Sequence, residues 1–160
     1  MSPILTLLLK DTFTLRGLKY RVNILRFYLI RYFFGTQSQE ERQWDDKDLV
    51  WLIPLASQIS QKFTKDNIYD AFADLEKQVS QLKVIIVYLT FEPDEFSLRE
   101  IGTKVRTLFS DIPLLDIKFD PNLIAGAALV WKGVYKDFSL RAAIEQKKQI
   151  ILGNFKKYFK

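Results

Sequence analysis

Two groups of carboxylates are the first residues of this sequence whose types and spacing suggest chemistry. Asp45, Asp46 and Asp48 offer the oxygen ligands that divalent cations prefer, but they lack the full spacing of a calcium-binding loop. Acidic side chains just before a helix also favour its positive end, and we adopt that interpretation. Residues 92–95 contain three carboxylates, yet acid–base catalysis requires environments that separate the pKa values of such a pair. We interpret this stretch as an exposed loop.

The residue types that most often carry catalysis are missing. The 160-residue sequence contains no cysteine and no histidine, which excludes disulfides, thiolate zinc sites and the commonest general base. Its six glycines are scattered and form neither of the common phosphate-binding patterns. No nucleophile, base and orienting group stand at a defined spacing. We therefore predict a protein that is not an enzyme, with no catalytic residue, cofactor, metal or small-molecule substrate.

Basic residues are concentrated near the start of the sequence. Residues 1–36 contain six Lys or Arg and one Asp, a net charge of +5, and the whole chain also carries +5. At about 100° per residue, polar side chains gather on one face of a helix over residues 15–34: Arg16, Lys19, Asn23, Arg26 and Arg31. Together with neighbouring aromatic residues, this stripe suits the phosphates of nucleic acid or of anionic lipid. Ordinary helix amphipathicity explains it too, and the sequence leaves both interpretations open.

Helices must position these residues in the first half of the chain. Ser2 before Pro3 predicts a short helix over residues 4–10, and Thr14 is a suitable cap for the helix over residues 15–34. Residues 35–48 are polar and charged, which predicts a linker. Apolar residues at helical spacing predict two further helices, the second capped by Thr64. Their core positions are Leu49, Leu52, Ile53, Ala56, Ile59 and Phe63, then Ile68, Phe72, Leu75, Val79 and Leu82.

The second half alternates strand and helix signals. β-branched and aromatic runs predict strands over residues 84–91 and 114–119, and a capping box at residues 97–100 predicts a helix between them. The inner face of that helix is expected to carry Leu98, Ile101, Val105, Leu108 and Phe109. The pair Lys132-Gly133 predicts a hairpin between two more strands, and Ser139 caps a final helix.

These signals predict the fold class and the division of the chain. We expect an α+β fold, in which amino-terminal helices precede a small mixed sheet of about four strands packed with helices. Residues 1–48 are expected to form a helical extension and linker, and residues 49–160 the α+β domain. The longest apolar region, residues 22–34, is interrupted by polar residues and is shorter than the roughly 20 residues that cross a bilayer. No spanning helix is therefore predicted.

The most specific pattern lies between Asp120 and Arg141. The segment contains Asp-Pro, a short apolar run, a small residue before a glycine, an apolar strand, a glycine hairpin, Asp-x-Ser and an apolar-Arg pair that opens the last helix. It resembles the carboxy-terminal signature of the ATP synthase delta family, whose mitochondrial member is the oligomycin-sensitivity-conferring protein. The residues that carry the resemblance have architectural roles in turns, close backbone approach and helix capping: Asp120, Pro121, Gly126, Gly133, Asp137, Ser139 and Arg141.

The resemblance implies a non-catalytic peripheral-stalk (stator) subunit of a rotary F-type ATP synthase, the complex of ATP synthesis and proton transport. Its partners would be the catalytic-head subunits and the b-type helices of the stalk, and it would bind no nucleic acid. It would be membrane-associated as a peripheral subunit on the cytoplasmic face of the bacterial inner membrane. A looser likeness covers residues 64–160. Upstream, the family has a bundle of about six helices that caps the head, whereas this chain has roughly 60 residues, enough for two or three helices.

Candidate partner contacts lie on two helices. On the last helix they are three apolar residues with lysines around them: Ile151, Phe155 and Phe159, with Lys147, Lys148, Lys156 and Lys157. The apolar three are equally suited to the core of the domain itself. On the basic helix the candidates are Arg26 and Arg31, which we hypothesise contact acidic ends of partner chains or a membrane surface. The alternative function, from a different class, is a basic α+β module that binds nucleic acid through Arg16, Lys19, Arg26, Arg31 and the terminal lysines.

Overall fold

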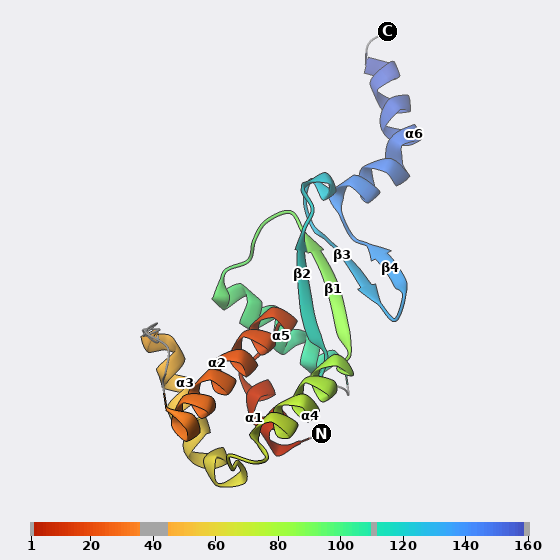
Figure 1. Cartoon of the computed structure of the whole chain (residues 1–160). Coiled ribbons are helices and arrows are strands. Elements are labelled where there is room, and N and C mark those ends of the chain that lie inside the picture. Colours follow the sequence, from red (N-terminus) through yellow and green to blue (C-terminus); the bar gives the residue numbers. More distant parts are fainter. Residues whose placement is uncertain (1, 36–44, 110–111, 159–160) are drawn as a thin grey trace. The chain divides into compact units, whose positions relative to one another are not determined.

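A computed structural model describes residues 2–35, 45–109 and 112–158 of the chain (Figure 1). The side chains of residues 61, 151 and 155–158 lie outside this description. The chain divides into two compact units, Met1–Leu82 and Lys83–Lys160, which we name the amino-terminal and carboxy-terminal units. The division predicted from the sequence, between residues 48 and 49, differs from the observed one. Helices after residue 48 pack with the preceding helices, because their apolar stripes complete the same core.

The amino-terminal unit is helical within its described residues. It contains α1 (Pro3–Lys10), α2 (Leu15–Phe34), α3 (Asp46–Ile59), a short 3-10 helix (Ser60–Lys62) and α4 (Ile68–Ser80). The first two helices confirm the prediction. The Ser2 hydroxyl accepts a hydrogen bond from the Leu5 N–H at 3.2 Å, and the Thr14 hydroxyl accepts one from the Gly17 N–H at 3.0 Å. Each cap satisfies a backbone donor that the first helical turn leaves free.

Two local predictions in this unit need correction. The predicted linker runs to residue 48, but α3 already begins at Asp46, because the Asp45 carboxylate accepts a hydrogen bond from the Lys47 N–H at 3.3 Å. The remainder of that linker, residues 36–44, lies outside the described residues. Thr64 does not cap α4 directly. Thr64 and Asn67 exchange hydrogen bonds in the turn before the helix, and α4 begins at Ile68.

Leucines and isoleucines from all four α-helices form the core of the amino-terminal unit. Each of the following side chains is at most 1% exposed: Leu5, Leu8, Leu9, Leu18, Leu25, Leu29, Leu52, Ile59 and Ile68. Polar contacts join the helices around this core. The Arg26 guanidinium pairs with the Glu76 carboxylate at 2.6 Å and lies over the Phe72 ring, so it links α2 to α4. Ser2 donates its backbone N–H to the Gln78 side chain at 2.6 Å and links the start of α1 to α4.

The carboxy-terminal unit confirms the predicted α+β fold class. Its elements are β1 (Val84–Leu89), α5 (Glu95–Leu108), β2 (Leu114–Phe119), a 3-10 helix (Pro121–Leu123), β3 (Ala127–Trp131), β4 (Val134–Asp137) and α6 (Leu140–Tyr158). The strands form a four-stranded mixed sheet of order β2-β1-β3-β4 within the described residues. β1 and β2 are parallel, with α5 as the connection between them, and β3 is antiparallel to both β1 and β4.

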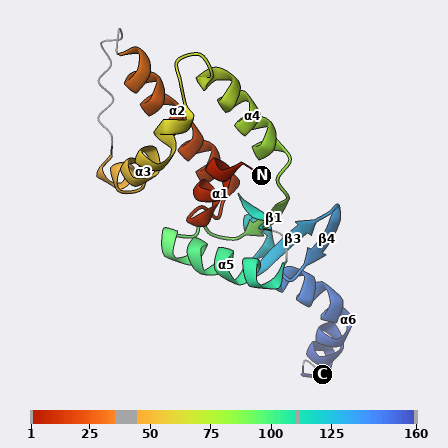
Figure 2. The same cartoon turned by 90° about the horizontal axis from the view of Figure 1, so that it is seen from below.

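One face of this sheet packs against α5 (Figure 2). Ile85, Val87 and Leu89 of β1 are at most 6% exposed and form a core cluster with Leu115 of β2. The other side chains of β1 are half-buried, so the burial of β1 alternates along the strand. Partly buried hydrophobic residues surround the cluster. Among them are Ile101 and Val105 of α5, Phe109 just after α5, and Leu129 and Trp131 of β3.

The start and the inner face of α5 also differ from the prediction. Asp94, rather than Ser97, caps the helix by accepting the Ser97 N–H at 2.8 Å, so the helix begins two residues before the predicted capping box. Hydrogen bonds from the Ser97 side chain and backbone lower the pKa of Asp94. Leu108 was expected to face inward but is 78% exposed. Val105 and Phe109 on either side of it pack against the sheet cluster, so the end of α5 contacts the sheet through these residues and not through Leu108.

Candidate protein-docking site

Six of the seven residues that carry the family resemblance lie near the place where β3 begins, β4 ends and α6 starts, whereas Gly133 lies in the turn at the other end of the β3–β4 hairpin. Gly126 precedes β3 with φ of +86°, a left-handed conformation that residues other than glycine adopt only at a cost. A Cβ atom at this position would lie 2.6 Å from the Phe138 carbonyl oxygen, so the glycine also allows two backbone segments to approach. Next to this approach, the Leu140 N–H donates to the Ala125 carbonyl at 2.8 Å. The start of α6 is thereby joined to the start of β3.

The hairpin between β3 and β4 has the turn that the sequence predicted. Lys132 and Gly133 have φ of +50° and +78°, the pair of left-handed residues that suits a two-residue hairpin between twisted strands. Trp131 pairs with Val134 across the turn, and Val130 pairs with Tyr135. Trp131 and Tyr135 therefore project from opposite faces of the sheet. The Trp131 ring packs edge-on against Phe109, with centroids 5.1 Å apart, which makes it part of the α5 face.

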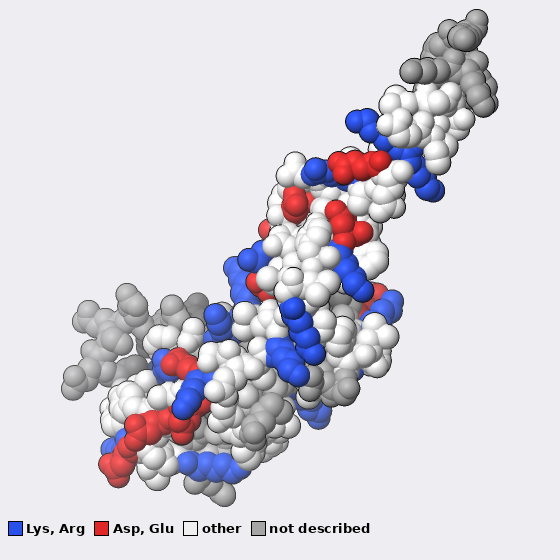
Figure 3. All heavy atoms as spheres, turned by 90° about the vertical axis from the view of Figure 1, so that its right-hand side faces the viewer, with Lys and Arg blue, Asp and Glu red and all other residues white. Residues whose placement is uncertain are grey.

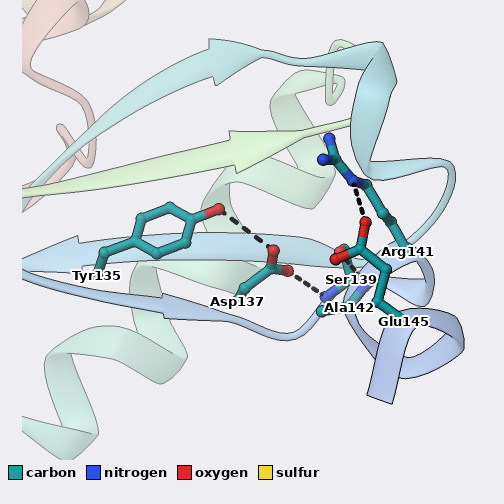
Figure 4. Close-up of polar contacts among 6 residues, drawn as sticks. All are labelled: Tyr135, Asp137, Ser139, Arg141, Ala142 and Glu145. Carbon is teal, nitrogen blue, oxygen red and sulfur yellow. Dashed lines mark hydrogen bonds and ion pairs between the residues drawn. The ribbon is translucent and has the colours of Figure 1, made fainter. Parts of the chain in front are cut away.

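A capped turn starts α6 at the end of β4 (Figure 4). Asp137 accepts the Ser139 N–H at 2.8 Å, and the Ser139 hydroxyl accepts the Ala142 N–H at 3.2 Å. Ser139 is 3% exposed, which holds this cap in one place. Hydrogen bonds from the Ser139 side chain and backbone lower the pKa of the Asp137 carboxyl. The direction in which α6 leaves the sheet is thus fixed by Asp137, Ser139 and the Gly126 approach.

The charged residues of the junction stabilise this geometry. Arg141 donates from Nε to the Glu145 carboxylate at 3.1 Å, one turn further along α6. This pair raises the pKa of Arg141, and the nearby Asp120 and Asp137 add to the effect. Asp120 caps the 3-10 helix by accepting the Asn122 N–H at 3.0 Å. Tyr135 donates its hydroxyl to Asp137 at 3.4 Å, and loss of water contact together with that carboxylate raises its pKa.

α6 presents its described side chains to solvent. Figure 1 shows the helix extending beyond the sheet of its unit, and none of its described side chains is buried. Leu140 and Ile144 are 46% and 43% exposed, and both lie on the predicted apolar stripe. Ile150 and Leu152 are 66% and 46% exposed. The described apolar residues of α6 are therefore available to a partner and are not part of the core of this unit.

The candidate contacts predicted from the sequence fall into three groups. Lys147 and Lys148 on α6 and Arg31 on α2 are exposed. Arg26 is engaged within the amino-terminal unit by its contacts with Glu76 and Phe72. The side chains of Ile151, Phe155, Lys156, Lys157 and Phe159 lie outside the described residues. In Figure 3, the Lys and Arg side chains on the face that is drawn are interspersed with Asp and Glu side chains and with uncharged surface.

Three of the acidic residues considered for chemistry have structural roles. Asp45 and Asp94 cap helices, as the sequence analysis favoured for the first group. Asp48 is 7% exposed and accepts hydrogen bonds from the Tyr20 hydroxyl at 2.6 Å and the Trp51 indole N–H at 3.1 Å. The three aspartates do not converge on one point, and no metal-ligating cluster of Asp or Glu occurs among the residues that the structure describes.

Sequence reasoning missed two features. Asp48 binds Tyr20, which lies 28 positions away in the sequence, as well as Trp51, and no local sequence pattern predicts the contact with Tyr20. A cleft of about 450 Å³ on the β3–β4 side of the sheet is lined mainly by apolar residues, among them Phe109, Trp131, Val134 and Phe138. The sequence contained one signal for this cleft. Every second residue of a strand faces the same side, which places Val134 and Lys136 of β4 on one face.

Comparison with known proteins gives no family assignment. No protein-family model matches the chain, and no curated protein matches it either. Among the described residues, no helix has the length and apolar character needed to cross a membrane. A functional assignment therefore depends on the geometry of the junction and on the resemblance of its sequence.

Proposed function

We propose that this chain is a non-catalytic stator subunit of a rotary F-type ATP synthase, a short relative of the delta family. It would link the catalytic head to the helices of the peripheral stalk. In this proposal it lies on the cytoplasmic face of the bacterial inner membrane as a peripheral subunit. The observation that carries the proposal is the junction between Asp120 and Arg141. There the turn, the glycine approach, the hairpin and the helix cap follow one another in the order of the family signature.

The exposed helix α6 supports an adaptor role. A link that resists torque needs contact area and several attachment points, and it needs no chemistry. The Gly126 approach and the Ser139 cap fix the start of α6 on the sheet, so a load on the helix is passed to the β3–β4 hairpin. Leu140 and Ile144 offer apolar contact on one side of the helix, with Lys147 and Lys148 beside them. We assign this face to the stalk contact.

The amino-terminal unit is the second attachment point in this proposal. It is a compact helical unit with its own core, although it is smaller than the family bundle of about six helices. The exposed Arg31 on α2 is its candidate contact with acidic segments of the head. The two units give the chain two separate surfaces, which is the minimum that a linker between two bodies requires.

Co-purification tests the proposal directly. The tagged full chain is recovered from its native membranes, and the accompanying proteins are identified by mass spectrometry. We expect the catalytic-head and stalk subunits in proportion to the tagged chain. Recovery of the tagged chain alone contradicts the proposal. Steeply salt-dependent binding of the purified chain to duplex or single-stranded nucleic acid would favour the alternative function instead.

A matched pair of α6 variants tests the stalk contact. Ile144→Asp places a charge on the apolar face, and Gln146→Asp places the same charge on the opposite face of the same helix. We expect Ile144→Asp to lower the recovery of stalk subunits by about tenfold or more, because an unpaired charge at an apolar contact is costly. Gln146→Asp should recover them normally. Equal recovery with both variants would contradict the assignment of this face.

A further inference from the structure

The face of the sheet that carries α5 is covered unevenly. Four strands that each occupy about 4.8 Å make a sheet about 19 Å wide, whereas a helix is about 10 Å across. α5 packs over the cluster of β1 and β2 through Ile101 and Val105, where Ile85 and Val87 are 4% exposed. On the same face, Val134 of β4 is 57% exposed and Phe138, just after β4, is 64% exposed. One helix thus covers half of a face whose width suits two.

The uncovered half contains the cleft of about 450 Å³ described above. Phe109, at the end of α5, and Trp131 pack against each other at its inner side, and Leu129 also lines it. Its other lining residues are Val134 and Phe138 and the two lysines Lys132 and Lys136. Lys136 pairs with Leu129 across the strands, which places it on the same face. The charged residues of the lining are therefore all basic: Lys136 lies on β4, and the Lys132 ammonium, at the turn, lies 5.6 Å from the centroid of the Trp131 ring.

We propose that this β3–β4 cleft binds one amphipathic α-helix of a partner protein, with acidic residues along one flank. The place beside α5 has the width of one helix, and helices on a sheet pack side by side about 10 Å apart. The apolar stripe of the partner would cover Trp131, Val134 and Phe138. Its acidic flank would lie beside Lys132 and Lys136, where opposite charges favour binding. The inference rests on the sheet face alone and does not require that the partner belongs to an ATP synthase.

Synthetic helices are suitable probes for this cleft. We would use a fluorescent peptide of about 18 residues with leucines at positions i, i+3, i+4 and i+7 and glutamates on one flank. A second peptide has lysine in place of every glutamate. Binding to the purified full chain is followed by fluorescence anisotropy at low salt. We expect the glutamate peptide to bind saturably and at least about tenfold more tightly than the lysine peptide.

Variants on two sides of one strand locate the binding site. Val134→Ser removes apolar contact from the cleft, and Tyr135→Ser changes the next residue, which is 55% exposed on the opposite face. We expect Val134→Ser to weaken binding of the glutamate peptide by about tenfold and Tyr135→Ser to leave it unchanged. The double variant Lys132→Glu and Lys136→Glu should bind the lysine peptide in preference. Circular dichroism and the melting temperature verify that each variant is folded.

Three results would overturn the inference. The first is the absence of saturable binding by the glutamate peptide. The second is equal weakening by Val134→Ser and Tyr135→Ser, or an unchanged peptide preference after charge reversal at Lys132 and Lys136. The third is self-association of the chain that Val134→Ser abolishes in sedimentation experiments, because the cleft would then hold a second copy. Because these assays contain no ATP synthase subunit, their outcome is separate from that of the co-purification.

Discussion

α2 and α6 are helices of nearly equal length, 20 and 19 residues, in different units. Both begin at a side-chain cap, and both carry basic residues on one side. α2 buries five side chains, among them Leu18, Leu25 and Leu29 at 0% exposure, and its neighbours in the unit cover that stripe. α6 buries none of its described side chains. Similar sequence patterns therefore have different outcomes: the apolar residues of α2 are buried in the core of its unit, whereas the described apolar residues of α6 lie on the surface.

The difference shows what an apolar stripe does and does not determine. A stripe specifies that a helix must be covered on one side, because exposed apolar area is unfavourable in water. It does not specify whether the cover comes from the same chain. In the amino-terminal unit, α1, α3 and α4 supply the cover. In the carboxy-terminal unit, α6 and the β3–β4 cleft lack it among the described residues, and these are the surfaces that we assign to partners.

The largest expected effect is a difference in stability between two matched truncations, one in α2 and one in α6. Leu25→Ala in α2 removes a side chain with 0% exposure, and Leu152→Ala in α6 removes one with 46% exposure. We expect Leu25→Ala to reduce the free energy of unfolding by about 2–5 kcal/mol, because it leaves a cavity. Leu152→Ala should change it by less than about 0.5 kcal/mol. Denaturant unfolding of both variants measures the difference, and equal losses would contradict the comparison.

The next effect concerns the junction that directs α6. Gly126→Ala places a Cβ 2.6 Å from the Phe138 carbonyl oxygen in addition to the left-handed backbone, and we expect a loss of about 3 kcal/mol of stability. Gly133→Ala shares the left-handed backbone, with φ of +78°, but meets no atom within 4 Å. It should lose only about 1–2 kcal/mol. Thermal unfolding of both variants tests this order, and the reverse order would show that the close approach is not needed.

A smaller effect compares the caps of the two helices. Ser139→Ala and Thr14→Ala each remove a cap that is worth about 1 kcal/mol. Because packing holds α2 and not α6, we expect the first variant to fray α6 and the second to leave the length of α2 unchanged. Amide hydrogen exchange at residues 140–143 and 15–18 measures the two helix starts. Equal protection in both variants would mean that α6 is held by contacts other than its cap.

The smallest expected effect is a pH dependence at the start of α6. The pKa of Asp137 is lowered in the folded chain, so its contribution is fully present above the unfolded value of about 3.9 and is lost as pH falls through the folded value. We expect the Ser139 amide resonance to shift in the window below about pH 4. Asp137→Asn keeps an acceptor without the charge and should remove the shift. A shift that persists in this variant would assign the titration to another group.

Much of the secondary structure could be predicted from the sequence. The spans of α2 and β2 were predicted to the residue, and so were the hairpin at Lys132 and Gly133 and the Ser139 cap. Each of these depends on neighbouring residues: an apolar period, a cap beside the donors that it satisfies, or a residue type that adopts positive φ. The α+β fold class followed from the order of these signals along the chain.

Only the tertiary structure decided how these elements share their surfaces. The unit boundary at residues 82 and 83, the buried Asp48, the exposed Leu108 and the cleft beside Trp131 each depend on residues far apart in the sequence. Burial is a property of what packs against a side chain, and a stripe or an alternating strand contains no information about its cover. The sequence by itself therefore determined most of the elements and the caps of α1, α2 and α6, whereas packing determined which apolar surfaces became core and which remained open to partners.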